Sequence, residues 1–538
     1  INTCTVTNLA DRKSRQYIRR MKKQCPQAIV AVTGCYAQVK PEEVAALPEV
    51  DIVAGTGEKN HLVRYVGEYL QNHSKQTHIL EYDALTSYHD KGIITSMDSR
   101  TRAYIKIQEG CTRFCSYCLI PFARGQVRSR DPREIILEAQ TLIANGFKEL
   151  VLTGINTALY GTEENFLYPL LPSEQERGMR GIEIIINRLN ALEGDFRIRL
   201  SSLEPTVVNA DYVKRLLAYE KLCPHLHLSI QSGSDKIIAA MNRHYNREEY
   251  LDIVRVLKAR DPHYGITTDI ICGFPGETDE DFADSVRMVE EAGFLKVHAF
   301  KYSKREGTAA YEMKNQVPGE IKNARVTALI EAGERQAEIF LRESIGEVRS
   351  VLFEEYAGDE ARNAGEPGIN IENGDDARPA DKRLLCGYAE NYVKVYAMGS
   401  AEDFHCFKKV KLLRRTERRN FTMSDCVFCM IANHEIPSNI AYEDDKIIAF
   451  HDLDPQAPVH VLVIPKKHIA SLDATTDEDQ ELLGYLLCKI KDIAKDLGLE
   501  NGYRVVSNNG DDAFQTVKHL HFHVIGKQPM GWPPVPKQ

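Results

Sequence analysis

Long hydrophobic runs are absent from this sequence. No stretch of its 538 residues approaches the roughly 20 apolar positions that a membrane-spanning helix needs. A charged segment followed by an apolar one, as in a secretory signal, is also absent from its beginning. We therefore expect a cytoplasmic protein with no membrane partner.

An excess of positive charge is also lacking. The formal net charge of -9 argues against a protein coated in nucleic acid, although a local basic patch could still bind it. One such patch is FKKVKLLRRTERR, residues 407–419, with seven basic residues and a single acid. A solvated basic linker is an equally good interpretation of this composition.

Length and cysteine content are high by contrast. The chain, with 43% hydrophobic residues, exceeds what one hydrophobic core usually accommodates, so we expect three or more domains. Its thirteen cysteines, several at short spacings, indicate metal or redox chemistry more than disulfides.

The order of apolar and amphipathic segments predicts an α/β multidomain protein. Residues 1–72 are expected to form a truncated α/β domain, because INTCTVTN is typical of a strand end entering a helix and the natural chain would begin before Ile1. Six apolar strands alternate with helical stretches over 97–340, as in a partial β/α barrel. Short strands over 345–414 predict a small all-β barrel, and an α+β domain is expected over 424–538.

Three cysteines are closely spaced in EGCTRFCSYCLIPFARG, residues 109–125: Cys111, Cys115 and Cys118. Three thiolates on a loop after a strand can hold three irons of a four-iron cluster and leave the fourth iron open for chemistry. A zinc site that takes its fourth ligand from elsewhere is the alternative that the spacing leaves open.

This C-x3-C-x2-C spacing, with Tyr117 before its last cysteine and a barrel strand before its first, resembles the radical S-adenosylmethionine superfamily. The resemblance implies that the open iron of a 4Fe-4S cluster is chelated by S-adenosylmethionine. It also implies reductive cleavage of that cofactor to a deoxyadenosyl radical, and an electron donor such as flavodoxin or ferredoxin.

Further motifs narrow the resemblance. They follow one another as INTCTVTNLADRKSRQ, VTGCYAQ, RLSSLEP, LSIQSGSD, TDIICGFPGETDEDF and FKYSKREGTAA. Together they resemble the methylthiotransferases, which insert sulfur and a methyl group at an unactivated C–H bond. The opening segment is most similar to the branch acting on C2 of N6-threonylcarbamoyladenosine at tRNA position 37, which implies the anticodon stem-loop as partner. Related branches act on isopentenyladenosine in tRNA or on a ribosomal protein, and these remain alternatives.

The family resemblance also implies a second 4Fe-4S cluster, on which sulfur insertion depends. Cys4 and Cys35 match the second and third of its cysteine ligands, and the first belongs to a strand that would precede Ile1. The auxiliary cluster is therefore expected to be incomplete here. Polar residues at barrel strand ends are candidates for the cofactor pocket, although each could equally form a turn: Asn156, Ser201, Glu204, Gln231, Ser232 and Asp269.

Residues 345–414 resemble the TRAM domain, an RNA-binding module. The strand GYAENYVKV offers Tyr388, Tyr392 and Lys394 for RNA contacts, with packing in a core as the alternative. An acidic insertion at 367–377 departs from a plainly basic surface.

The segment KHLHFHVIG near the end of the chain places His519, His521 and His523 at alternate positions. On a strand, all three side chains would lie on one face, where imidazoles can attack phosphorus through a covalent histidine intermediate or bind a metal.

The whole segment 424–538 resembles the histidine triad (HIT) family, specifically its purine nucleoside phosphoramidase branch. This resemblance implies a homodimer acting on a purine nucleotide or nucleoside phosphoramidate. His521 would be the nucleophile, with His519, His523 and His460 as its partners. The nucleotide would be held by Asp452, Asn508 and Thr516. The C-x-x-C pair Cys426 and Cys429, with His468 and His519, would form a zinc site.

Three hypotheses follow. The leading one is a chain with two enzyme activities, a radical tRNA methylthiotransferase and a histidine triad hydrolase. A rival treats residues 1–415 as an RNA-binding module whose cysteines hold zinc and catalyse nothing, and iron and sulfide analysis separates the two. A third is that two neighbouring genes have been joined, because Met423 followed by SDCVFCMI is typical of a natural start.

Overall fold

The computed structural model describes most of the chain. The described residues are 1–86, 88, 92–95, 101–163, 166, 178–179, 181–356, 369–371, 383–415, 426–434, 438–452, 455–510, 513, 515, 517 and 519–531. They fall into two compact units, one up to Arg415 and one from Cys426 onward. Within these ranges, no helix has the length and apolar character needed to cross a membrane.

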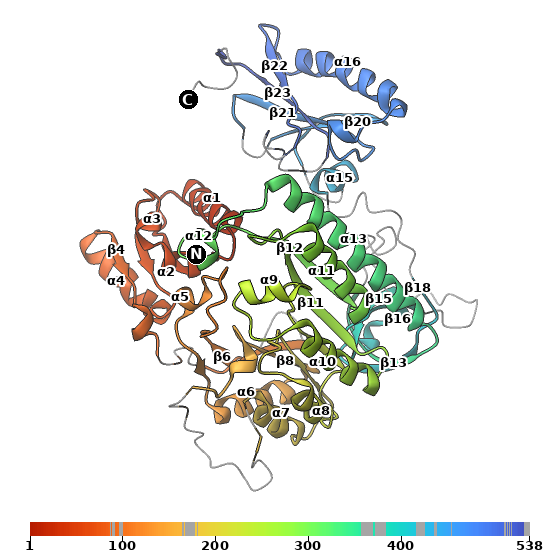
Figure 1. Cartoon of the computed structure of the whole chain (residues 1–538). Helices are drawn as coiled ribbons and strands as arrows, with labels where there is room; N and C mark the ends of the chain where they lie inside the picture. Colours follow the sequence, from red (N-terminus) through yellow and green to blue (C-terminus); the bar gives the residue numbers. More distant parts are fainter. Residues whose placement is uncertain are drawn as a thin grey trace. The chain divides into compact units, whose positions relative to one another are not determined.

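The first unit begins with a four-stranded parallel sheet (Figure 1). Its strands, in spatial order, are β1 (Asn2–Thr3), β2 (Ala31–Gly34), β3 (Ile52–Ala54) and β4 (Gln76–His78). Its helices are α1 (Asn8–Gln24), α2 (Cys35–Val39), α3 (Pro41–Ala45) and α4 (Leu62–Asn72). The hydroxyl of Thr7 accepts a hydrogen bond from the backbone N–H of Ala10 and so caps α1. The predicted passage from a strand end into a capped helix is therefore confirmed.

A partial β/α barrel follows, as the alternation of apolar and helical segments predicts. One parallel sheet contains β5 (Arg102–Lys106), β8 (Glu149–Thr153) and β9 (Arg197–Leu200), and a second contains β10 (His225–His227), β11 (Gly265–Cys272) and β12 (Lys296–Lys301). Parallel bridges at Ile198–Leu222 and Leu203–Leu228 link the two sheets. The six strands predicted from the sequence are all present.

Helices cover the outer side of these strands (Figure 1). They are α6 (Pro132–Ala144), α7 (Ile182–Asn190), α8 (Ala210–Leu216), α9 (Asp235–Ala240), α10 (Arg247–Arg260), α11 (Asp279–Ala292) and α13 (Gly319–Glu343). Shorter elements are β6 (Gln108–Glu109), α5 (Ile120–Arg124), β7 (Arg128–Ser129) and α12 (Ala309–Glu312). Strand residues such as Ile105 and Leu152 pack against helix residues such as Ile185 in one continuous apolar core.

The first unit ends in an all-β domain with its own apolar core. Its strands are β13 (Val348–Tyr356), β14 (Ile369–Ile371), β15 (Arg383–Ala389), β16 (Lys394–Gly399), β17 (Phe407–Lys411) and β18 (Arg414–Arg415), in the spatial order β17-β13-β15-β16-β14-β18.

The aromatic residues proposed for RNA binding lie between this domain and the barrel. Tyr388 stacks on Tyr392, with 5.1 Å between ring centroids. The guanidinium of Arg102 lies 5.3 Å from the Tyr388 ring, and that of Arg199 lies 4.8 Å from the Tyr392 ring. Of the two interpretations of these tyrosines, the structure therefore favours packing.

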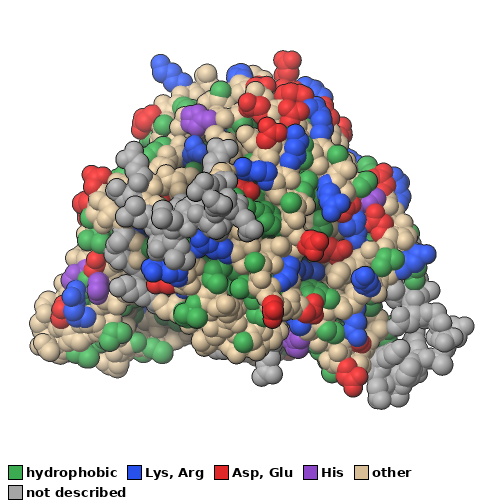
Figure 2. Space-filling model, turned by 90° about the horizontal axis from the view of Figure 1, so that it is seen from below, with side chains coloured by type: hydrophobic (Ala, Val, Ile, Leu, Met, Phe, Trp, Pro, Cys, Tyr) green, Lys and Arg blue, Asp and Glu red, His purple; other side chains and the backbone are tan. Residues whose placement is uncertain are grey.

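The basic patch at 407–419 is only partly within the described residues. Lys408, Lys409 and Lys411 belong to β17, whereas 416–419 and most of the acidic insertion lie outside the described ranges. On the face shown in Figure 2, Lys and Arg side chains are interspersed with Asp and Glu.

The second unit is a five-stranded antiparallel sheet with one long helix. Its strands are β19 (Ile440–Glu443), β20 (Ile447–His451), β21 (Val459–Pro465), β22 (Tyr503–Val506) and β23 (Phe522–Gly526), in the spatial order β19-β20-β21-β23-β22. Helix α15 (Val427–Ala432) precedes the sheet, and α16 (Gln480–Asp496) packs on it through Leu486 and Ile490. This arrangement is the predicted α+β domain.

Candidate functional sites

The loop that carries Cys111, Cys115 and Cys118 is closed at its base. Strands β6 and β7 pair antiparallel on either side of it, and the backbone N–H of Cys111 donates to the carbonyl oxygen of Gly125 at 3.1 Å. Gly110 has a φ of +77°, and a Cβ there would lie 1.7 Å from the carbonyl oxygen of Gln126. The tight base therefore requires glycine at this position.

The surroundings of the three thiols suit a metal cluster. Burial raises the pKa of the Cys118 thiol to about 12 and also raises that of Cys111, so that neither ionises unaided at neutral pH. Arg243 Nη1 lies 3.4 Å from Cys115 Sγ, and the backbone N–H of Ile120 lies 3.4 Å from Cys118 Sγ. These donors face sulfur atoms that would be negative when bound to iron.

Glu204, in the segment that follows β9, connects the cysteine loop to the barrel. Its buried carboxylate accepts hydrogen bonds from Arg113 Nε at 2.7 Å and from Asn156 Nδ2 at 2.9 Å. Arg243 Nη1 lies 3.5 Å from its other oxygen. The structure thus brings together Asn156 and Glu204, two of the residues predicted to line the cofactor pocket.

Two polar atoms at the same strand ends have no partner among the described residues. They are Asn156 Oδ1 and Ser201 Oγ, both buried. Buried polar atoms in native proteins are nearly always hydrogen-bonded, so a polar ligand or a water molecule would satisfy these two atoms. S-adenosylmethionine, with its amino, carboxylate and hydroxyl groups, has the chemistry to supply one.

The remaining three candidates divide between the barrel end and a turn. The backbone N–H of Gln231 donates to the carbonyl oxygen of Asp269 at 2.9 Å, and Asp269 Oδ2 lies 3.2 Å from His227 Nε2. Burial raises the pKa of Asp269, but His227 outweighs this and holds it below its usual value. Ser232 is fully buried, and its hydroxyl contacts that of Ser285 at 3.4 Å, so its bonding belongs to the turn before α9.

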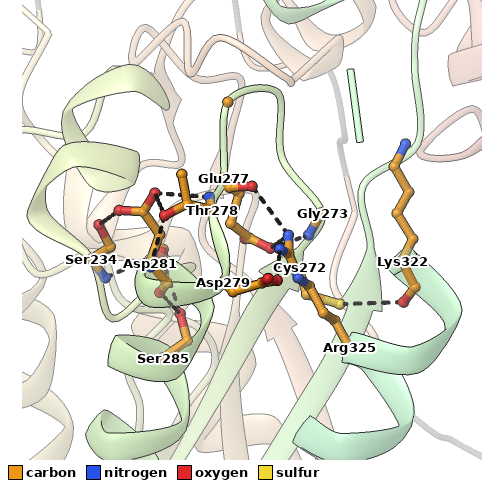
Figure 3. Close-up of polar contacts among 12 residues, drawn as sticks. Ser234, Cys272, Gly273, Glu277, Thr278, Asp279, Asp281, Ser285, Lys322 and Arg325 are labelled. Atoms are coloured by element: carbon orange, nitrogen blue, oxygen red, sulfur yellow. Dashed lines mark hydrogen bonds and ion pairs between the residues drawn. The ribbon is translucent and has the colours of Figure 1, made fainter. Parts of the chain in front are cut away.

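The GFPGET turn after β11 is held by its own polar contacts (Figure 3). Glu277 accepts the backbone N–H of Gly273 at 2.8 Å and pairs with Arg325 of α13 at 2.7 Å. Thr278 caps α11 by accepting the backbone N–H of Asp281 at 3.2 Å. The turn and the helix cap explain the motif without a ligand.

Cys4 and Cys35 follow matching ends of paired strands. The register of β1 and β2 places Thr3 opposite Gly34, so that each cysteine comes directly after its strand. Cys35 is buried and Cys4 is exposed. Arg124, at the end of α5, places its Nε 3.2 Å from Cys35 Sγ and so connects this site to the three-cysteine loop.

In the second unit, the histidines separate into two groups. Strand β23 begins at Phe522, so only His523 of the three alternating histidines lies on it; the expectation of one strand carrying all three is wrong. The physical reason is that the backbone N–H of Leu520 donates to the carbonyl oxygen of Ile469, which does not belong to the sheet. His521 remains close to His523, with 5.0 Å between ring centroids, whereas the His519 ring turns toward His468.

The His521 group has a defined arrangement of protons. His521 Nδ1 lies 2.6 Å from the carbonyl oxygen of His519, which can only accept, so that Nδ1 carries the proton and Nε2 keeps its lone pair. Burial lowers the pKa of His521, and burial with the neighbouring histidines lowers that of His523 to about 4. His460 Nε2 lies 2.8 Å from His523 Nδ1 and 3.6 Å from Asp452 Oδ2. At neutral pH the group offers a neutral nitrogen nucleophile.

The second group gathers two cysteines and two histidines, whose ligand atoms all lie within 4.8 Å of one another: Cys426, Cys429, His468 and His519. His519 Nδ1 lies 3.3 Å from both sulfur atoms, and Cys429 Sγ lies 3.2 Å from His468 Nδ1. His519 Nε2 donates to the carbonyl oxygen of Pro465 at 2.9 Å, which leaves Nδ1 as the ligand atom. Two thiolates and two imidazoles with this proximity fit a tetrahedral zinc ion.

Two proposed nucleotide ligands receive less support from the structure. Thr516 lies outside the described residues, and Asn508 is half-buried in the segment after β22. The sequence reasoning also missed Arg113, Arg243 and His227. Arg113 lies between the first two cysteines, so its place in the motif could have identified it. Arg243 and His227 lie far from the motif in the sequence, and only the fold brings them to the site.

Comparisons with protein families divide the chain into three matched segments. Residues 1–55 match "Uncharacterized protein family UPF0004", residues 105–289 match the "Radical SAM superfamily", and residues 433–530 match the "HIT domain".

Curated relatives match most of the first unit. The threonylcarbamoyladenosine tRNA methylthiotransferase MtaB of Bacillus subtilis is 37% identical over 415 residues, covering 77% of this chain and 85% of the relative. A protein of the same name from Thermotoga maritima is 35% identical, covering 75% and 84%. The tRNA-2-methylthio-N(6)-dimethylallyladenosine synthase of Caldicellulosiruptor saccharolyticus is 37% identical, covering 66% and 74%.

Among solved structures, a HIT family hydrolase from Legionella pneumophila is 48% identical. It covers 20% of this chain and 99% of its own, with a TM-score of 0.20.

Proposed function

Because the chain belongs to the radical SAM tRNA methylthiotransferases and carries a HIT domain at its C-terminal end, we propose that its first unit adds a methylthio group to C2 of N6-threonylcarbamoyladenosine at tRNA position 37. The observation that carries this proposal is the closed three-cysteine loop joined through Glu204 to barrel ends with partnerless polar atoms. A radical mechanism needs both a cluster and a cofactor pocket beside it.

The proposed domain boundaries accompany this function. The methylthiotransferase N-terminal domain would span 1–72, the radical SAM core 97–340, the TRAM domain 345–414 and the HIT domain 424–538. An electron donor such as flavodoxin or ferredoxin and the anticodon stem-loop of tRNA would be the partners of the first unit.

Cys111, Cys115 and Cys118 would hold a 4Fe-4S cluster, with Cys4 and Cys35 contributing to a second one. When bound, the first cluster supplies the electron and the open iron that radical chemistry on S-adenosylmethionine requires. Arg113 and Arg243 would offset the negative charge of the thiolates. Asn156 Oδ1, Ser201 Oγ and Asp269 would orient the polar groups of the cofactor, with Gln231 shaping the pocket between strands.

The direct test uses reconstituted protein with a reductant, S-adenosylmethionine and tRNA from cells that lack the 2-methylthio modification. Mass spectrometry of the digested nucleosides should show 2-methylthio-N6-threonylcarbamoyladenosine. Product formed only on dimethylallyladenosine would show that the chain has the substrate of the dimethylallyladenosine branch instead. Absence of any methylthio product, with the cluster present, would contradict the proposal.

For the HIT domain, we propose hydrolysis of purine nucleoside phosphoramidates. His521 Nε2 attacks phosphorus, and the P–N bond to the amine breaks as the amine takes a proton from solvent. Water then attacks phosphorus, the bond between phosphorus and His521 breaks, and the nucleoside monophosphate is released. His460 and His523 would orient one another beside the phosphate, with Asp452 near the ribose. The neutral state and bare Nε2 of His521 support this role.

Cys426, Cys429, His468 and His519 would hold zinc in this proposal, and the domain would act as a homodimer. A zinc ion there supplies a structural link between α15 and the segment before β23. His521→Ala should abolish phosphoramidate hydrolysis, measured by release of a fluorescent amine, and leave zinc and iron contents unchanged. Hydrolysis retained within tenfold of wild type would exclude His521 as the nucleophile.

A further inference from the structure

A cleft of about 580 Å³ opens in the first unit beside both cysteine sites. Gly34, which precedes Cys35, lines one side of it, and Arg124, at the end of the helix after Cys118, lines another. Its volume is that of pockets that bind small molecules or a substituted base.

The lining of this cleft is polar and positively charged. Three cationic side chains line it, Lys59, Lys106 and Arg124, together with Asn2 and three threonines, Thr33, Thr56 and Thr153. No described residue that lines the cleft is acidic, and Ile155 is its one apolar side chain with more than a methyl group.

Two of these cations contact a buried carboxylate behind the cleft. Glu109 lies 3.0 Å from Lys106 Nζ and 2.8 Å from Arg124 Nη1, and its side chain is 3% exposed. The Glu109 carboxylate is thus already paired and does not line the cleft, whose described lining offers cationic side chains and no acidic one.

The position of the cleft connects it to the reaction. Gly154 and Ile155 follow β8, and the backbone N–H groups of Ile155 and Asn156 both donate to Gln108 Oε1 at 3.0 Å. Asn156 in turn donates to Glu204 in the proposed cofactor pocket. A substrate in this cleft would thus lie between the proposed cofactor pocket and Cys35.

The positive lining of the cleft suits one of two modified adenosines better than the other. These are threonylcarbamoyladenosine and dimethylallyladenosine, which appear in the names of the curated relatives. The threonylcarbamoyl group ends in a carboxylate, whereas the dimethylallyl group is a hydrocarbon. Placing a hydrocarbon against ammonium and guanidinium groups removes water from charges without giving them a partner, which is unfavourable. A carboxylate would replace that water with charge-assisted hydrogen bonds.

We propose that Lys106 and Lys59, with Arg124, form a subsite that binds the carboxylate of the N6-threonylcarbamoyl group and thereby selects this adenosine over the dimethylallyl one. This inference rests on the proposed function and names the residues that decide its substrate. A backbone phosphate of tRNA is the other anion that could meet these cations, and the experiment separates the two.

The test measures binding of three anticodon stem-loop RNAs to the reconstituted full chain by fluorescence anisotropy. The RNAs carry N6-threonylcarbamoyladenosine, its methyl ester or dimethylallyladenosine at position 37, and they share every phosphate. The wild-type chain should bind the free acid about tenfold more tightly than the other two. Lys106→Met should bind the acid and the ester alike, whereas Lys106→Arg should keep the preference.

Lys148→Met is the matched control, because Lys148 precedes the opposite end of β8 and pairs with Asp195 on the surface. It should keep the tenfold preference. Equal binding of the acid and the ester by the wild-type chain would overturn the proposal, even if no variant folds. If Lys106→Met lowers the affinity for all three RNAs equally, the cations bind a backbone phosphate. If the variant loses iron, the cations balance the charge of the cluster. Either result contradicts the carboxylate subsite.

These outcomes are distinct from failure of the proposed function. Selective binding of the free acid without any methylthio product would leave the subsite intact and overturn the reaction. Methylthiolation of the dimethylallyl RNA in preference to the acid would overturn the subsite and leave the reaction class intact.

Discussion

Arg113 and Arg243 reach the three-cysteine loop and converge on Glu204. Without metal, the raised pKa values keep Cys111 and Cys118 neutral, and the two arginines share the charge of the one carboxylate. Binding of a metal would deprotonate the thiols and place new negative charge next to these arginines. The loop therefore already has cationic side chains next to the sulfur atoms that would become negative when a cluster binds.

The base of this loop gives the first prediction. Gly110→Ala adds a Cβ at a position with positive φ, where it would meet the carbonyl oxygen of Gln126 at 1.7 Å. The loop cannot close with that atom in place, so iron content after anaerobic reconstitution should fall by more than half. Gly67→Ala is the control, because a Cβ at Gly67 in α4 meets nothing within 4 Å. Full iron content in Gly110→Ala would show that the loop closes in another way.

Sequence spacing was sufficient to single out the cysteines that we propose as cluster ligands. Cys111, Cys115 and Cys118 are separated by fixed short intervals, and such intervals survive folding. Arg243 could not be found in this way, because it approaches Cys115 from a position 128 residues later in the chain. Contacts of that kind depend on how the barrel strands are ordered, which local patterns do not record.

At the scale of elements, a buried ion cluster attaches the all-β domain to the barrel. Glu149 of β8 is fully buried and contacts Arg102, Arg197 and Arg199 at 2.6 to 2.9 Å. Arg197 also donates to the carbonyl oxygens of Ser350 and Tyr388 in the β-domain. Glu149 thus pairs with the arginine that bonds directly to the backbone of the β-domain.

Glu149→Gln should therefore destabilise the first unit. Removing the charge leaves three buried arginines without their shared partner, which costs about 3–5 kcal/mol. Guanidinium unfolding followed by far-UV circular dichroism measures the change. Asp195→Asn, which breaks an exposed pair with Lys148, should change stability by less than about 1 kcal/mol. A Glu149→Gln effect of the same small size would contradict the anchoring role.

The same carboxylate predicts a pH dependence. Burial raises the pKa of Glu149, but the arginines outweigh it and hold the pKa well below its usual value. The unfolded chain therefore binds the proton first as pH falls, and the stabilisation present above about pH 4.3 is lost below it. The wild-type chain should lose stability more steeply with acid than Glu149→Gln, and parallel pH profiles would contradict this.

Most helices and strands could be predicted from the sequence, but the pairing of strands and the tertiary contacts of side chains could not. Apolar runs located all six barrel strands, although β5 and β12 are only partly buried. The strand with three histidines was predicted too long, because alternation alone does not show that the backbone before Phe522 pairs elsewhere. The role of Tyr388 and Tyr392 also depended on tertiary contacts with arginines of the barrel.

At the scale of the whole molecule, the two units have separate apolar cores. The clusters around Val461 and Phe450 contain only residues of the second unit. A domain that buries its own core is expected to fold without its neighbour. The chain is therefore expected to behave as two independent proteins joined by a linker.

Expression of residues 423–538 alone tests this independence. The fragment should fold, bind zinc, form a dimer and hydrolyse a phosphoramidate at the rate of the full chain within about twofold. Size-exclusion chromatography with light scattering and the fluorescent-amine assay measure these properties. An insoluble fragment, or one with activity restored only by adding residues 1–415, would show coupling between the units.

The most direct measurement for the whole account is iron and sulfide analysis of the anaerobically reconstituted chain, with electron paramagnetic resonance recorded before and after S-adenosylmethionine is added. We expect about four irons with as much sulfide, rising to about eight if Cys4 and Cys35 complete a second cluster. The reduced signal should shift when the cofactor is added and be lost in Cys118→Ala. Zinc without labile sulfide, or a signal that the cofactor leaves unchanged, would contradict the radical chemistry assigned to the first unit.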